Sequence, residues 1–199
     1  MAGRTRNTEL LAVLIRHGLT RAAAVAVAAL GQRLRELSAA AGVEAAAMVD
    51  ASTGEQLGDI LPGGPFGVSI APHLAAARRA RGRKFVQIHT HVGSTSFSED
   101  DAAVLVAYGR IAVVTVSALD GAWYVLSETA PRRASSARAR RVIARFIDEY
   151  ERLRPAYRQR VASGEIDESE ARREHPHEVW QRVKAELGLR YDRVEPSDA

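Results

Sequence analysis

The chain has 199 residues, of which 46% are hydrophobic and 26% charged, and its formal net charge is +4. This balance is that of a globular protein, which excludes wholesale disorder, and the length suits one domain with a helical appendage or two small domains. Because the chain has no cysteine, disulfides, thiol nucleophiles and cysteine-bound zinc or iron–sulfur centres are excluded as well.

The first segment, residues 1–41, is predicted to be helical. Apolar side chains recur at helical spacing across residues 8–40. Gly18 interrupts the pattern, and Thr20 has the chemistry of a helix N-cap, so two helices are expected. Gly42 is predicted to end the second helix.

Residues 22–30 also have the composition of a signal-peptide core. Arg33 and Arg35 follow soon after, and the helical pattern continues through them, so we interpret the stretch as helix and expect a cytoplasmic protein. No apolar run reaches the ~18 residues of a membrane span, so no membrane partner is expected.

The central part, residues 42–130, is predicted to alternate between strands and short helices. Strands are expected over residues 44–50, 55–60, 85–89, 111–118 and 123–126. Helices are expected over residues 71–81 and 98–108. Pro72 suits the first turn of one helix, and Ser98 suits the N-cap of the other, where acidic residues follow in the first turn.

The C-terminal part, residues 131–199, is predicted to be a helical extension. A long Arg-rich helix is expected over residues 131–162 and a second over residues 168–187, interrupted or entered at Pro176. The fold class is therefore α/β (α+β): a mixed sheet flanked by helices, with an N-terminal helical segment and a C-terminal helical extension.

Several polar and aromatic residues outside the central motif are expected to have structural roles. His175 and His177 lie two apart on a helix, where side chains diverge by about 200°, so we expect both on the solvated surface. His73 is expected to cap or solvate a helix end. The aromatic residues of the two long helices are expected to pack between them: Phe146, Tyr150 and Trp180.

A cluster of basic residues is a candidate nucleic-acid patch. It comprises Arg78, Arg79, Arg81, Arg83 and Lys84. No aromatic residue interleaves with it, so a solvated helix end is the favoured interpretation, and nucleic acid is the less favoured partner.

The most informative segment begins with His89 and His91. Side chains two apart on a strand point to the same side, so both imidazoles can converge on one ion. Ser98 and Asp101 follow at the start of the next predicted helix, from which Asp101 can reach the same point. Two histidines and one carboxylate leave a coordination position open, as in a catalytic zinc site.

The order His-x-His, short loop, Ser-x-x-Asp resembles the signature of the JAMM (MPN+) metalloprotease family over roughly residues 42–128. The short loop is similar to that of a bacterial and phage branch, which includes domains attached to phage head-morphogenesis proteins. Val92 stands where the family usually has proline. The resemblance implies a cytidine-deaminase-like JAMM/MPN fold, with Zn²⁺ on His89, His91 and Asp101.

The resemblance also implies a glutamate from an upstream strand as general base. Glu44 opens one predicted strand, and Glu55 follows the next turn. Glu44 is favoured because it starts a strand that runs into a turn, as in related enzymes, but both remain open. Ser98 would donate a hydrogen bond to the oxyanion of the tetrahedral intermediate.

The function expected from the resemblance is zinc-dependent hydrolysis of a peptide or isopeptide bond by a metal-activated water. Its substrate would be a protein or peptide, with ubiquitin-like proteins and phage structural proteins as candidates. The alternative is a phage-particle or assembly module that retains the fold without turnover, located in the host cytoplasm or the virion. Apolar stripes on the terminal helices would allow a homo-oligomer.

Overall fold

The computed structural model of the chain describes residues 2–130 and 132–196. Its helices are α1 (Ala2–Arg16), α2 (Arg21–Ala41), α3 (Ala71–Arg79), α4 (Glu99–Ala107), α5 (Ser136–Ala162) and α6 (Glu168–Leu187). Its strands are β1 (Ala45–Asp50), β2 (Leu61–Pro62), β3 (Phe85–His89), β4 (Ile111–Ser117), β5 (Trp123–Glu128) and β6 (Leu189–Val194).

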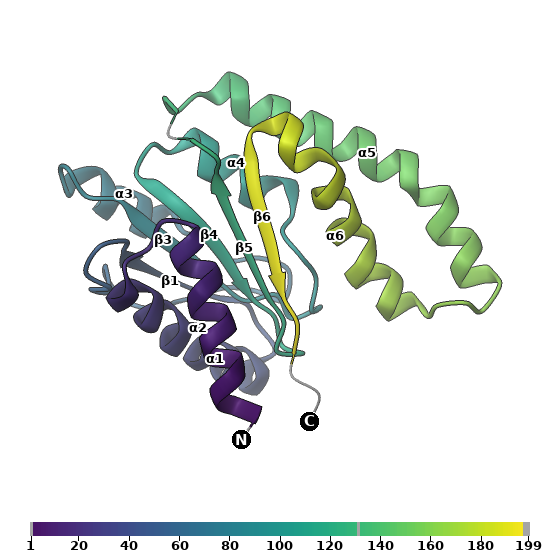
Figure 1. Cartoon of the computed structure of the whole chain (residues 1–199), viewed down its shortest axis with the longest axis horizontal. Helices are drawn as coiled ribbons and strands as arrows, with labels where there is room; N and C mark the ends of the chain where they lie inside the picture. Colours follow the sequence, from purple (N-terminus) through teal and green to yellow (C-terminus); the bar gives the residue numbers. More distant parts are fainter. Residues whose placement is uncertain (1, 131, 197–199) are drawn as a thin grey trace.

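The strands form one mixed sheet in the order β2-β1-β3-β4-β5-β6 (Figure 1). Only β3 and β4 run parallel, and α4 makes the crossover between them. The other neighbours are antiparallel. The expected mixed α/β class is therefore confirmed.

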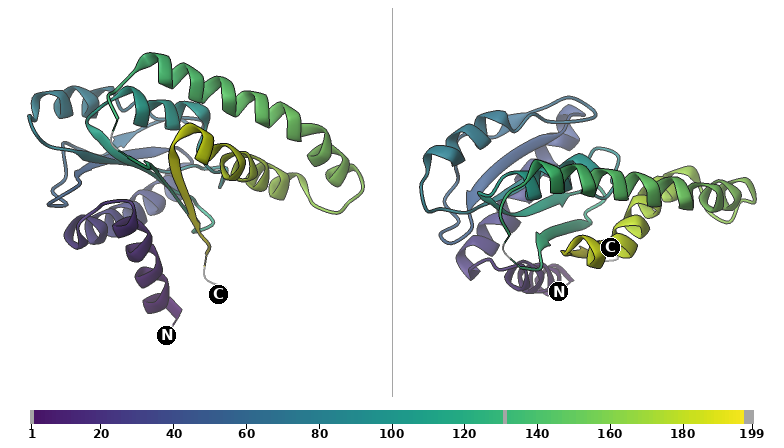
Figure 2. Two further views of the ribbon diagram at one scale, coloured as in Figure 1. Left: turned by 45° about the horizontal axis from the view of Figure 1, so that its top comes forward. Right: turned by 90° about the horizontal axis from the view of Figure 1, so that it is seen from above.

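Helices cover both faces of the sheet, so the molecule has three layers (Figure 2). On one face, α1 and α2 bury alternate residues of β1 such as Ala45, Ala47 and Val49. On the other face, α3 to α6 share a core with residues such as Met48 and Tyr124. Because both faces are buried, the central strands β1, β3 and β4 are mostly apolar, whereas the edge strand β6 contains three charged residues.

The N-terminal helices follow the capping chemistry of the sequence. The Thr20 side chain accepts a hydrogen bond from the Ala23 amide, and Gly42 ends α2 in the left-handed region at φ 66°. Residues 22–30 therefore belong to a helix packed on the sheet. Gly31 allows the close approach of the Trp123 ring to α2, since a Cβ there would collide with that ring.

The predicted strand over residues 55–60 is wrong. In this segment Gln56 forms only an isolated bridge to Val49, and the strand that pairs with β1 on the side away from β3 is β2. The physical reason lies at Gly58, whose φ of +73° turns the chain out of the extended conformation.

The C-terminal part contains a strand that the sequence pattern did not predict. β6 pairs with β5 along its whole length and forms one edge of the sheet. α5 begins at Ser136, later than expected, and α6 continues through Pro176. As predicted, Phe146 packs against Trp180, with ring centroids 4.7 Å apart.

Three histidines expected at the surface are held inside the protein. His175 is buried and stacks on Tyr150 and Tyr157, with ring centroids 3.8 and 4.5 Å away. His177 is half-buried, 2.7 Å from the Tyr191 hydroxyl. His73 is buried, and its Nε2 lies 2.8 Å from the Asp59 carbonyl. The helix periodicity did not reveal these positions because the partners come from other elements.

No helix in the described part of the chain is long and apolar enough to cross a membrane.

Candidate metal centre

The end of β3 places two imidazoles on the same side of the sheet. Gln87 and His89 alternate with residues whose side chains face α1 and α2, so they face the α4 layer. His91 lies two residues beyond His89, just after the strand. Between them Thr90 points the other way, and its Oγ1 is 2.6 Å from Ser38 Oγ and accepts a hydrogen bond from the Ala45 amide at 2.9 Å. Thr90 thus fixes the backbone from which both histidines project.

The start of α4 supplies the third group. Asp101 Oδ1 lies 3.1 Å from His89 Nε2, and Asp101 Oδ2 lies 3.5 Å from His91 Nε2. The two Nε2 atoms are 3.0 Å apart. A tetrahedral zinc site with bonds of about 2.0–2.1 Å places its ligand atoms about 3.3 Å from one another. The separations are close to this value, with one carboxylate oxygen facing each imidazole, so the three side chains could hold such an ion.

The outer nitrogens of both imidazoles face acceptors. His89 Nδ1 lies 3.0 Å from Gln87 Oε1, and His91 Nδ1 lies 3.1 Å from the Thr95 carbonyl oxygen. An acceptor at Nδ1 favours a proton on that nitrogen, and in this tautomer each Nε2 offers a lone pair to a metal ion. Two lone pairs that face each other at 3.0 Å repel unless a cation lies between them. The donor set thus fits a bound metal ion.

Ser98 and Asp101 form the capping box of α4. The Asp101 amide donates to Ser98 Oγ at 3.2 Å, and Asp101 Oδ2 accepts from both the Ser98 amide and the Ser98 hydroxyl at 2.8 Å. The expected N-cap is therefore confirmed. The same bonds orient the carboxylate toward the histidines, so the cap and the metal centre share Asp101.

The structure brings Glu44 to this centre and leaves Glu55 far from it. Glu44 directly precedes β1 at the end where Ala46 pairs with His89. Glu55 follows the opposite end of β1, where its side chain is exposed and pairs with Arg83 at 2.7 Å.

A tight loop holds Glu44 in place. Its amide donates to the Gly64 carbonyl and its carbonyl accepts from the Gly63 amide, both at 2.8 Å. Gly63 is required here, because a Cβ at this position would collide with the Gly67 carbonyl and Val68. The loop therefore fixes the backbone of Glu44 against the edge of the cleft.

Burial and charge shift the pKa values of both carboxylates. Burial raises the pKa of Glu44, and the nearby imidazoles of His91 and His89 only partly offset this effect. Burial would also raise the pKa of Asp101, but the two facing imidazoles hold it well below its usual value. Asp101 is thus kept as a carboxylate, whereas Glu44 is made a better proton acceptor.

All these groups line one cleft of about 710 Å³, which contains Glu44, His89, His91, Ser98 and Asp101. The sequence did not single out several other residues of its wall. Gln87 and Thr95 hold the imidazoles, Phe66 stands 97% exposed at the mouth, and Arg172 reaches it from α6. The role of Gln87 could have been predicted from the sequence. It is a polar residue in an otherwise apolar strand, and because it lies two positions before His89 its side chain faces the same side of the sheet as His89.

The comparisons with known proteins do not identify the chain. No protein-family model, no curated protein and no solved structure matches it.

Proposed function

We propose that this protein is a JAMM-type zinc-dependent metallopeptidase or isopeptidase with a cytidine-deaminase-like core. The observation that carries the proposal is the convergence of His89 Nε2, His91 Nε2 and the Asp101 carboxylate beside a buried glutamate. The mixed sheet and the motif order His-x-His, Ser-x-x-Asp support the same conclusion.

The roles of the residues follow from their positions. When bound, Zn²⁺ would lower the pKa of a coordinated water and polarise the scissile carbonyl. His89, His91 and Asp101 would hold the ion. Glu44, with its raised pKa, would take a proton from the attacking water and hand it to the leaving amine.

Ser98 is proposed to donate a hydrogen bond to the oxyanion. Its hydroxyl has one proton, which in the structure is donated to Asp101 Oδ2. Binding of substrate would therefore require the hydroxyl to rotate toward the carbonyl oxygen. Ser98→Ala is expected to lower kcat by about 10²- to 10³-fold with zinc retained. An unchanged kcat, with only the ~1 kcal/mol loss of stability expected of a missing N-cap, would restrict Ser98 to capping.

The proposal is tested by metal content and hydrolysis in matched variants. We expect about one zinc per chain and cleavage of a peptide or isopeptide substrate by the purified protein. Glu44→Gln should keep the metal and abolish cleavage, whereas Glu55→Gln should change neither. Absence of metal in the wild-type protein would refute the metal centre. Zinc without cleavage of any tested substrate would favour the phage-particle or assembly module.

A further inference from the structure

A groove leads from the metal centre along the α5–α6 hairpin. The metal cleft shares His91, Thr95, Ser98 and Arg172 with a neighbouring hollow of about 460 Å³. That hollow in turn shares Tyr150 and Arg172 with a third, of about 600 Å³, between α5 and α6. Because each hollow shares walls with the next, the three form one path from the metal ligands to the tip of the hairpin.

The middle of this groove is apolar. Phe146, Ile147 and Tyr150 line it from α5, and Pro176 lines it from α6. Ile147 is 44% exposed, so its side chain can be reached from the groove. This section therefore suits an apolar side chain of a bound polypeptide.

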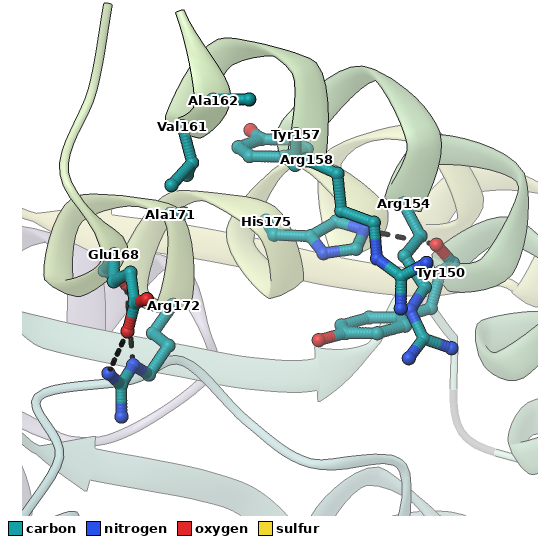
Figure 3. A pocket seen from close by; sticks show the side chains of 10 residues that line it. All are labelled: Tyr150, Arg154, Tyr157, Arg158, Val161, Ala162, Glu168, Ala171, Arg172 and His175. Carbon is teal, nitrogen blue, oxygen red and sulfur yellow. Dashed lines mark hydrogen bonds and ion pairs between the residues drawn. The ribbon is translucent and has the colours of Figure 1, made fainter. Parts of the chain in front are cut away.

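The far end of the groove is basic. Arg154 and Arg158, one helical turn apart on α5, project into it beside Tyr150, and Arg172 lies across from them (Figure 3). Arg154 pairs with Glu151 at 2.9 Å and Arg172 with Glu168 at 3.0 Å. The Arg158 guanidinium makes no hydrogen bond or ion pair within the described residues. Positive charge thus remains uncompensated at this end.

A buried glutamate neutralises another group of arginines on the hairpin. Glu149 is buried and pairs with Arg145 and Arg152 on α5 and with Arg182 on α6. Among the α5 arginines without an ion pair in the described residues, Arg158 lines the groove whereas Arg140 and Arg141 do not, so its charge is available there to an anionic partner.

We propose that the α5–α6 groove binds an extended acidic segment of the protein substrate, an inference that rests on the proposed peptidase function. An apolar residue of the substrate would contact Ile147, and its acidic residues would reach Arg154 and Arg158. These arginines lie about 10 to 16 Å from Ile147 along α5. An extended chain covers that distance in about three to five residues.

The groove suits a polypeptide better than a nucleic acid. Glu99, Glu151 and Glu168 also line it, and these carboxylates would repel a continuous phosphate backbone. Tyr150 and Tyr157 already stack on His175, so these ring faces are not free to stack on bases. A polypeptide can instead place its acidic side chains only opposite the arginines and keep them away from the glutamates.

Binding can be measured separately from turnover in the Glu44→Gln protein. The probe is a fluorescein-labelled peptide with a leucine followed, about four residues later, by a run of glutamates; a second peptide carries glutamines instead. Fluorescence anisotropy is expected to show tighter binding of the glutamate peptide. The double variant Arg154→Ala/Arg158→Ala should bind the glutamate peptide about ten-fold more weakly, which is the effect of losing two partly exposed charge pairs.

The matched control is Arg140→Ala/Arg141→Ala, which removes two exposed arginines of the same helix outside the groove. The control should bind the peptide like the parent protein. Equal affinity for both peptides, equal losses in the two double variants, or tighter binding of single-stranded DNA would overturn the proposal. If wild-type protein bound the acidic peptide but held no zinc, the peptidase function would fail and the acidic-segment site would stand.

Discussion

Gln87 and Thr95 determine which nitrogen each histidine presents to the metal. Both accept a hydrogen bond from an imidazole Nδ1, and such partners orient the ring and raise its basicity. Gln87→Leu removes the acceptor and places an apolar side chain of similar size in the buried strand. We expect the zinc dissociation constant to rise about 10- to 100-fold, measured by competition with a chromogenic chelator.

Gln87→Glu provides the control, because a carboxylate still accepts the Nδ1 proton of His89. That variant should bind zinc at least as tightly as the wild type. Unchanged zinc affinity in Gln87→Leu would show that β3 alone orients the ring.

The two aspartates at the start of α4 give a second residue-level contrast. Asp101 contacts both imidazoles, whereas Asp100, one residue earlier, is exposed and points about 100° away. Asp101→Ala is therefore expected to lose stoichiometric zinc, and Asp100→Ala to keep it, in an isothermal titration of the apo proteins. Equal zinc loss in the two variants would contradict the ligand assignment.

At the scale of elements, His17 connects the end of α1 with β5 and β6. Its Nε2 donates to Asp192 Oδ2 and its Nδ1 accepts from the Ser127 hydroxyl, both at 2.8 Å. Burial lowers the pKa of His17 from 6.5 to about 4, so the folded state holds the neutral ring. The unfolded chain binds a proton at His17 more tightly than the folded protein does. The contribution of the buried neutral ring to stability is therefore complete above pH 6.5 and is lost as the pH falls toward 4.

The expected loss is ~3 kcal/mol of unfolding free energy between those pH values. Urea titrations at a series of pH values measure it. His17→Gln keeps one donor and one acceptor but does not titrate, so its stability should fall less steeply over this range. Parallel pH profiles for the two proteins would assign the acid sensitivity to other groups.

Elements with local signals were predictable, and those that depend on distant partners were not. Thr20 and Ser98 marked helix starts correctly because a cap is made by residues next to each other in sequence. β6 was missed because its alternation is interrupted by Arg193, whose burial depends on Glu174 of α6 and the ring of Tyr124. The candidate site was predictable from spacing on one strand and one helix, but Arg172 reaches it only through the packing of α6.

At the scale of the whole molecule, the C-terminal part holds the loop between the metal ligands. Trp180 Nε1 of α6 donates to the Phe97 carbonyl at 2.8 Å, and the Tyr191 hydroxyl of β6 lies 2.8 Å from Ser96 Oγ. Both contacts are buried. The loop that carries His91 toward Ser98 is therefore supported by residues from the other end of the chain.

Residues 42–130 contain every proposed ligand and the proposed base, yet they are expected not to fold alone. Without the C-terminal part, β5 loses its pairing with β6, and the loop at Phe97 loses the Trp180 donor. Without α1 and α2, the apolar face of β1 is exposed to water. We expect the 42–130 fragment to show no cooperative thermal transition by circular dichroism and no stoichiometric zinc binding, in contrast to the full chain. A fragment that unfolds cooperatively and binds zinc as the full chain does would show that the flanking helices and β6 are dispensable for the metal centre.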